Sequence, residues 1–149
     1  MIPDWKVEYY YRDKPDEPFP PYRVLEPDEA RQFRASLLAR LGLALEANDK
    51  EIAYALRDSC SVLLPGHAKS PEFDILGVLQ NLGPRADEFV LAWSIHWEEL
   101  NEATAIARSD LARVFEYVWY PSSDDLFVFS EDAQSFVWID HGGYCFRST

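Results

Sequence analysis

The sequence predicts one domain of the α+β class, with N-terminal helices packed on a C-terminal antiparallel sheet. Helix start signals and apolar residues at helical spacing fill residues 27–82. Strand-forming residues joined by short turns fill the last third of the chain. The 149 residues are the size of a single domain, and 48% of them are hydrophobic, which is enough to bury a core. Because helices precede strands, we expect the helices to cover one face of the sheet.

The N-terminal half contains one predicted strand and two predicted helices. Residues 5–11 alternate weakly and predict an edge strand, and the proline-rich stretch 14–21 predicts an extended connection. Proline at the first helical position, followed by two acidic residues, predicts a helix over residues 27–48. A capping-box pattern at Asn48 and Glu51 then begins a second helix, which ends before the next Pro-Gly pair.

The middle of the chain changes from helical to strand patterns. Ser-Pro-Glu at 70–72 predicts the start of a third helix, and Gly-Pro at 83–84 ends it. Residues 89–95 predict a strand, whereas 103–107 fit either its antiparallel neighbour or a helix. Ser-Asp at 109–110 predicts the cap of a short helix.

The C-terminal third predicts a three-stranded meander. Residues 125–129 and 135–139 are rich in branched and aromatic side chains, and 130–134 supplies a hairpin loop between them. Gly-Gly at 142–143 indicates a second tight turn before 144–146. Short connections of this kind favour antiparallel neighbours.

Acidic residues are concentrated in one part of the chain. The net charge is −12, and residues 72–132 contain 13 acidic and three basic residues, a net of −10. Binding to nucleic acid or to an anionic membrane requires the opposite sign, so we expect neither. The charge favours a basic protein partner. The alternative interpretation is that the acidity serves solubility alone.

The sequence contains no convincing catalytic, metal or cofactor signature. Cys60 and Cys145 lie in no metal or redox spacing, which predicts two small buried core residues. The histidines follow no zinc-ligand pattern, and no glycine-rich phosphate loop is present, so we expect no cofactor. Without a leader or a bilayer-length apolar run, the expected location is the cytoplasm.

The alternative function is a small enzyme of undescribed type, for which two residue pairs are the candidate reactive groups. Asp124 and Asp125 offer paired carboxylates, but adjacent residues in an extended chain point to opposite faces, so a turn or partner contact is favoured. His141 lies near Cys145 across the second turn, as a base and nucleophile would. Because nothing in the sequence orients that base, we favour structural roles for both.

One segment has the character of a recognition surface. Trp97 stands among glutamates, and an aromatic anchor surrounded by carboxylates suits a basic partner that pairs and stacks at once. The alternative is a solvated helix start with Trp97 in the core. Acidic residues of the C-terminal turns extend the negatively charged surface around Trp97. The predicted partner-binding residues are Trp97, Glu98, Glu99, Glu102, Asp124, Asp125, Glu131 and Asp132.

Two C-terminal runs carry a family resemblance. Residues 119–129 read WYPSSDDLFVF, and residues 135–146 read SFVWIDHGGYCF. They resemble the C-terminal strands of small bacterial immunity proteins of polymorphic or contact-dependent growth-inhibition toxin systems. The resemblance implies a non-catalytic cytoplasmic protein that binds and blocks a cognate toxin, commonly a cationic nuclease. It carries no functional residue over to this chain, and an adaptor with a non-toxin partner is the further alternative. The oligomeric state stays open.

Overall fold

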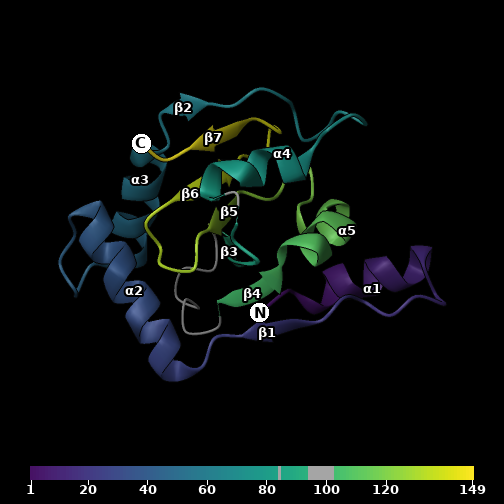
Figure 1. Cartoon of the computed structure of the whole chain (residues 1–149), viewed down its shortest axis with the longest axis horizontal. Coiled ribbons are helices and arrows are strands. Elements are labelled where there is room, and N and C mark those ends of the chain that lie inside the picture. The colour runs from purple at the N-terminus through teal and green to yellow at the C-terminus, as the bar shows by residue number, and fades with distance from the viewer. Residues whose placement is uncertain (84, 94–102) are drawn as a thin grey trace.

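The computed structural model describes residues 1–83, 85–93 and 103–149, and it confirms the α+β class (Figure 1). The described strands form one antiparallel sheet in the order β1-β4-β3-β5-β6-β7-β2. The strands are β1 (Tyr22–Val24), β2 (Val62–Leu63), β3 (Glu88–Trp93), β4 (Thr104–Ala107), β5 (Leu126–Phe129), β6 (Phe136–Ile139) and β7 (Cys145–Arg147). The helices are α1 (Asp4–Asp13), α2 (Pro27–Leu41), α3 (Asp49–Ser59), α4 (Ile75–Leu79) with the 3₁₀ turn η1 (Gln80–Leu82), and α5 (Arg108–Val118).

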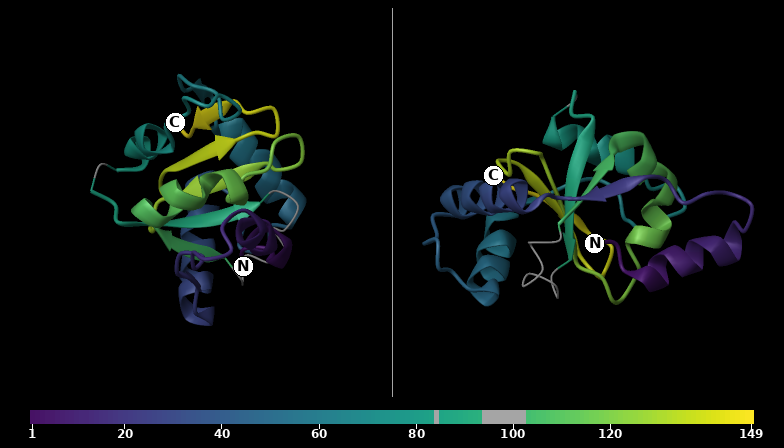
Figure 2. Two further views of the ribbon diagram at one scale, coloured as in Figure 1. Left: turned by 90° about the vertical axis from the view of Figure 1, so that its right-hand side faces the viewer. Right: turned by 90° about the horizontal axis from the view of Figure 1, so that it is seen from below.

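Helices cover both faces of the sheet, so the expectation of one covered face is wrong. Helices α1, α4 and α5 pack on one face and α2 and α3 on the other (Figure 2). All four residues of β5 are buried: Leu126 and Val128 belong to the first core, Phe127 and Phe129 to the second. An unbroken apolar run is the pattern of a strand buried on both sides, whereas one-sided burial gives alternation.

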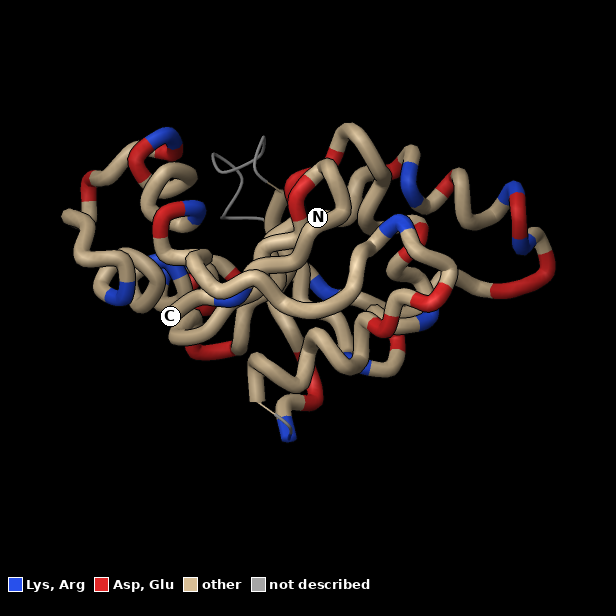
Figure 3. The backbone as a smooth tube through the Cα atoms, turned by 90° about the horizontal axis from the view of Figure 1, so that it is seen from above, with Lys and Arg blue, Asp and Glu red and all other residues tan. Residues whose placement is uncertain are grey.

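Charged residues lie mostly outside the central strands. Among β3, β4, β5 and β6, the described charged residue is Glu88, at the start of β3. Figure 3 shows charged positions spread around the backbone. Arg23 in β1 and Arg147 in β7 belong to outer strands. The surface chemistry is therefore set by the helices and by the turns at the strand ends.

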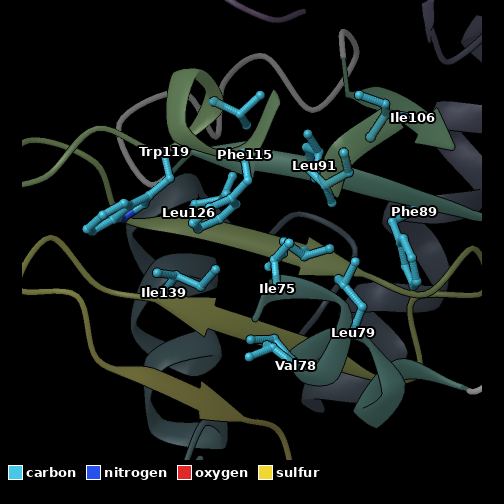
Figure 4. Packing of buried hydrophobic residues seen from close by; sticks show 14 of the residues in the cluster. Ile75, Val78, Leu79, Phe89, Leu91, Ile106, Phe115, Trp119, Leu126 and Ile139 are labelled. Atoms are coloured by element: carbon cyan, nitrogen blue, oxygen red, sulfur yellow. The ribbon is translucent and has the colours of Figure 1, made fainter. Parts of the chain in front are cut away.

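Short helix α4 covers the middle of the first face. Ile75, Val78 and Leu79 point from α4 toward the sheet, where they meet residues that include Leu126 and Ile139 (Figure 4). The predicted start at 70–72 is too early: turns occupy these residues, and the helix begins at Ile75. The two cysteines are buried and unpaired, as predicted.

The predicted edge strand at residues 5–11 is wrong, because this segment is helix α1. Ile2, Lys6 and Tyr10 are all buried at intervals of four residues, which is the spacing of one helix face. A lysine at the middle position hides this face in the sequence, because a charged residue is rarely fully buried. Strand β1 lies instead at Tyr22–Val24, where it pairs with β4.

The capping box at Asn48 and the C-terminal meander are confirmed, whereas the predicted cap at Ser109–Asp110 is wrong. Helix α5 already begins at Arg108, with Ala107 at the N-cap position and no side-chain cap hydrogen bond. Asn48 and Glu51 form both hydrogen bonds of the capping box at the start of α3. Helix α2 ends earlier than predicted, because Gly42 takes a left-handed φ of 68° immediately after Leu41. Of the two alternatives for residues 103–107, the strand is correct, because β4 pairs antiparallel with β3. Strands β5, β6 and β7 form the predicted meander.

None of the helices in the described ranges combines the length and the apolar character needed to cross a bilayer.

Candidate interaction surface

The predicted partner-binding residues fall into three groups in the structure. Trp97, Glu98, Glu99 and Glu102 lie outside the described residues. Asp124 and Asp125 precede β5, whereas Glu131 and Asp132 follow it in the β5–β6 hairpin. Four strand residues separate the last two groups, which is roughly 13 Å at about 3.3 Å per residue. The described carboxylates therefore form two separate groups.

Asp124 is inside the molecule. Its carboxylate is paired with the ammonium of Lys6 from α1, and the two side chains are 8% and 1% exposed. The same oxygen, Oδ2, accepts the backbone N–H of Tyr120 at 2.6 Å. Burial lowers the pKa of Lys6, and the hydrogen bond and charge of Asp124 oppose that shift. Asp124 thus joins α1 to the start of β5 and is not on the surface where a partner contact was predicted.

Asp125 turns to the opposite side and binds a different set of groups. It accepts from Arg57 Nη2 at 3.2 Å and from Trp138 Nε1 at 3.3 Å. Its Oδ1 also lies 3.0 Å from the backbone nitrogen of His141 and 3.2 Å from that residue's Nδ1. Two adjacent carboxylates with separate partners do not form an acid–base pair that shares a proton.

Asp132 shapes the β5–β6 hairpin. Its Oδ1 accepts from Ser130 Oγ at 2.6 Å and from the backbone nitrogen of Gln134 at 3.1 Å. These hydrogen bonds lower the pKa of Asp132, with the Ser130 hydroxyl making the largest contribution. The side chain therefore has a turn-forming role whether or not it meets a partner.

Glu131 and Asp132 border an acidic hollow of about 320 Å³ on the α2 side of the sheet. Glu29 and Glu88 line the same hollow. Arg23 neutralises part of this charge, with Nη1 and Nη2 each 2.7 Å from a Glu29 oxygen and Nη2 also 2.8 Å from Glu88. The carboxylates nearest β1 are therefore already paired within the protein.

The second candidate pair, His141 and Cys145, also has structural contacts that explain both side chains. The His141 ring lies against Asp125, as described above. Cys145 is buried in β7, and burial, with the nearby charge of Asp140, raises the pKa of its thiol to about 12. Such a thiol holds almost no thiolate near neutral pH, so this geometry does not activate Cys145 as a nucleophile. Among the described residues, no three His, Cys, Asp or Glu side chains are grouped to hold a metal ion.

A surface that the sequence did not predict lies along α1. Trp5, Tyr9 and Tyr120 are 42%, 44% and 45% exposed. We call them the aromatic cluster: the ring centroids are 6.0 Å apart for Trp5–Tyr9, 6.1 Å for Trp5–Tyr120 and 6.3 Å for Tyr9–Tyr120. Exposed aromatic rings that support one another offer a large contact area at low cost in side-chain entropy.

Carboxylates stand beside the aromatic cluster. A hollow of about 150 Å³ between α1 and α5 is lined by the three rings together with Asp13, Glu116 and Tyr117. The Tyr117 hydroxyl donates to Asp13 Oδ2 at 3.3 Å. Desolvation, followed by the negative charges of Glu116 and Asp13, raises the pKa of Tyr117 to about 12. The hollow therefore combines ring faces with a negative field.

The spacing along α1 explains why this surface was missed. Trp5, Tyr9 and Asp13 recur every four residues and share one face of the helix, which borders the buried face formed by Lys6 and Tyr10. The predicted strand at residues 5–11 stops before Asp13, so the four-residue spacing of Trp5, Tyr9 and Asp13 is not visible in that prediction. The contribution of Tyr120 comes from a turn more than one hundred residues away, which only the tertiary packing of α1 on α5 brings close.

No protein-family model matches this chain, and comparisons with curated proteins and with solved structures find no similar protein.

Proposed function

We propose that this protein is a non-catalytic immunity protein, which binds a basic bacterial toxin in the cytoplasm and neutralises it. The observation that carries the proposal is the aromatic cluster with Asp13 and Glu116 at its side, on a protein of net charge −12. Aromatic anchors at the centre of an interface supply most of its binding energy, and carboxylates select a cationic partner. The C-terminal resemblance to immunity proteins supports the same proposal.

The proposed mechanism is occlusion. The overall negative charge accelerates encounter with a basic toxin domain, and the buried aromatic contacts slow release. A toxin held in this way has its active site or substrate-binding face covered. The protein needs no chemistry of its own for this, only a surface that is complementary in charge and shape.

The alternatives predict different behaviour. An adaptor would use the same surface for a partner that is not a toxin. An enzyme would need reactive groups at Asp124/Asp125 or His141/Cys145, and the contacts of these side chains favour structural roles instead.

The test uses the full-length protein and the product of the adjacent gene. We expect a complex on size-exclusion chromatography whose affinity falls as salt rises, and survival of cells that express the toxin together with this protein. A complex without protection would favour the adaptor. Absence of a complex at both low and high salt, with no protection, would reject the proposal.

A further inference from the structure

Two of the hollows lined by acidic side chains differ in how much of their charge is already paired within the protein. In the hollow beside β1, Arg23 pairs with both Glu29 and Glu88. In the hollow between α1 and α5, Asp13 and Glu116 both act on Tyr117, whose hydroxyl has one proton to donate. Both carboxylates are exposed, and among the described residues neither forms an ion pair with a lysine or arginine. This second hollow therefore favours an added cation.

The rings of this surface already attract cations from the protein itself. The guanidinium carbon of Arg12 lies 5.1 Å from the centroid of Tyr9, and Lys6 Nζ lies 4.3 Å from that of Trp5. Lys6 is buried, whereas 42% of Trp5 is exposed, so part of Trp5 stays accessible to solvent beside this internal contact. The rings are thus placed for cation–π contacts from solvent as well.

The size of the hollow limits the occupant to one side chain. About 150 Å³ corresponds to roughly five waters at ~30 Å³ each. Such a space admits the end of a long side chain but not a helix or a strand.

We infer that the hollow between α1 and α5 binds one arginine side chain of the partner, whose guanidinium stacks on the aromatic cluster and pairs with Asp13 and Glu116. A planar guanidinium stacks on rings and has five donors in a fixed fork, so it reaches two carboxylates at once. A lysine ammonium is a strongly hydrated point charge and does neither as well. This inference rests on the proposed function, because it names the group through which the basic partner is recognised.

The first test needs no partner protein. The ¹⁵N-labelled full-length protein is titrated with N-acetyl-arginine amide and, separately, with N-acetyl-lysine amide, and amide and indole shifts are followed by NMR. Saturable shifts are expected around Trp5, Tyr9, Glu116 and Tyr120 with the arginine compound, and at least several-fold weaker binding with the lysine compound. Equal binding of the two, or shifts spread evenly over the acidic surface, would overturn the inference.

Charge variants at the hollow have matched controls elsewhere on the chain. The double variant Asp13→Asn/Glu116→Gln keeps the shape of both side chains and is expected to weaken arginine binding at least tenfold. The control Asp16→Asn/Glu72→Gln removes the same charge from exposed positions outside the hollow and should leave binding within about twofold. An equal loss in both double variants would indicate that net charge acts alone, and the inference would fail.

A ring variant has a control of the same type. Trp5→Ala is expected to abolish the arginine-dependent shifts, whereas Tyr54→Ala removes a 58% exposed ring on α3 and should not. Circular dichroism and melting temperature would establish that each variant is folded.

The two proposals fail in different ways. A toxin complex that forms equally well with Asp13→Asn/Glu116→Gln would overturn the arginine site and leave the immunity function standing. Arginine binding at the hollow, without any toxin complex or protection, would support the site and reject the immunity function.

Discussion

The buried pair Lys6–Asp124 is the residue-scale feature with the greatest consequence for stability. A lysine that is 1% exposed is retained in the core because Asp124 balances its charge. Removing one partner leaves the other charge buried and uncompensated, which costs about 3–5 kcal/mol. We therefore expect Lys6→Met and Asp124→Asn each to lower the free energy of unfolding by that amount in urea titrations.

The double variant Lys6→Met/Asp124→Asn completes the thermodynamic cycle. Because it removes both charges, it should be less destabilised than the sum of the single variants. Additive losses would show that the two side chains act independently, contrary to the observed pairing.

Asp132 provides a pH-dependent prediction. Its pKa is lowered in the folded state by the Ser130 hydroxyl and the Gln134 N–H. A carboxyl with a depressed folded pKa contributes stability that is present above its unfolded pKa, about 3.9, and is lost as pH falls through the folded value. The melting temperature of Asp132→Asn should lie below that of the wild type at pH 7, and the difference should narrow below about pH 4. A difference that is constant with pH would contradict this ionic contribution.

At the scale of elements, the capping box of α3 shows how well local signals predict structure. Asn48 accepts from the backbone nitrogen of Glu51 at 3.1 Å, and Glu51 accepts from that of Asn48 at 2.8 Å. Both partners lie within one turn of the chain, so the sequence contains all the information needed. The same is true of the β5–β6–β7 meander, whose turns and strands are adjacent in sequence.

Substitution of the cap gives the corresponding prediction. Asn48→Ala should lower the free energy of unfolding by about 1 kcal/mol, because an unsatisfied N–H is left at the helix start. Urea denaturation measures the loss, and Asn48→Asp serves as the control because aspartate also caps. Equal destabilisation by alanine and aspartate would exclude the cap as the cause.

Elements whose environment depends on distant residues were not predictable in the same way. The sequence does not predict helix α1, because Lys6 interrupts its apolar face. Lys6 is buried in the structure because Asp124 pairs with it. Strands β1 and β2 have three and two residues, and partners far along the chain define them. The aromatic cluster joins Trp5 to Tyr120 for the same reason, so it was absent from the sequence-based site.

At the scale of the whole molecule, the sheet is shared by two cores. Phe136 belongs to the core under α2 and α3, and its neighbour Val137 belongs to the core under α1, α4 and α5. Because one continuous sheet serves both layers, we expect their stabilities to be coupled.

The coupling makes a testable prediction about unfolding. Phe33→Ala in α2 and Leu111→Ala in α5 remove buried side chains from opposite cores, with expected losses of about 3–5 and 2–5 kcal/mol. Each should shift one common transition, followed by both near-UV and far-UV circular dichroism. Two separated transitions in either variant would show that the layers unfold independently.

The short outer strands have a consequence for the behaviour of the protein at high concentration. Strand β1 ends one side of the sheet with three residues, and β2 ends the other side with two. An incoming chain finds few unpaired N–H and C=O groups there, and beside β1 it also meets the ion pairs of Arg23. A β-rich centre enclosed in this way resists the strand-by-strand growth that leads to fibres.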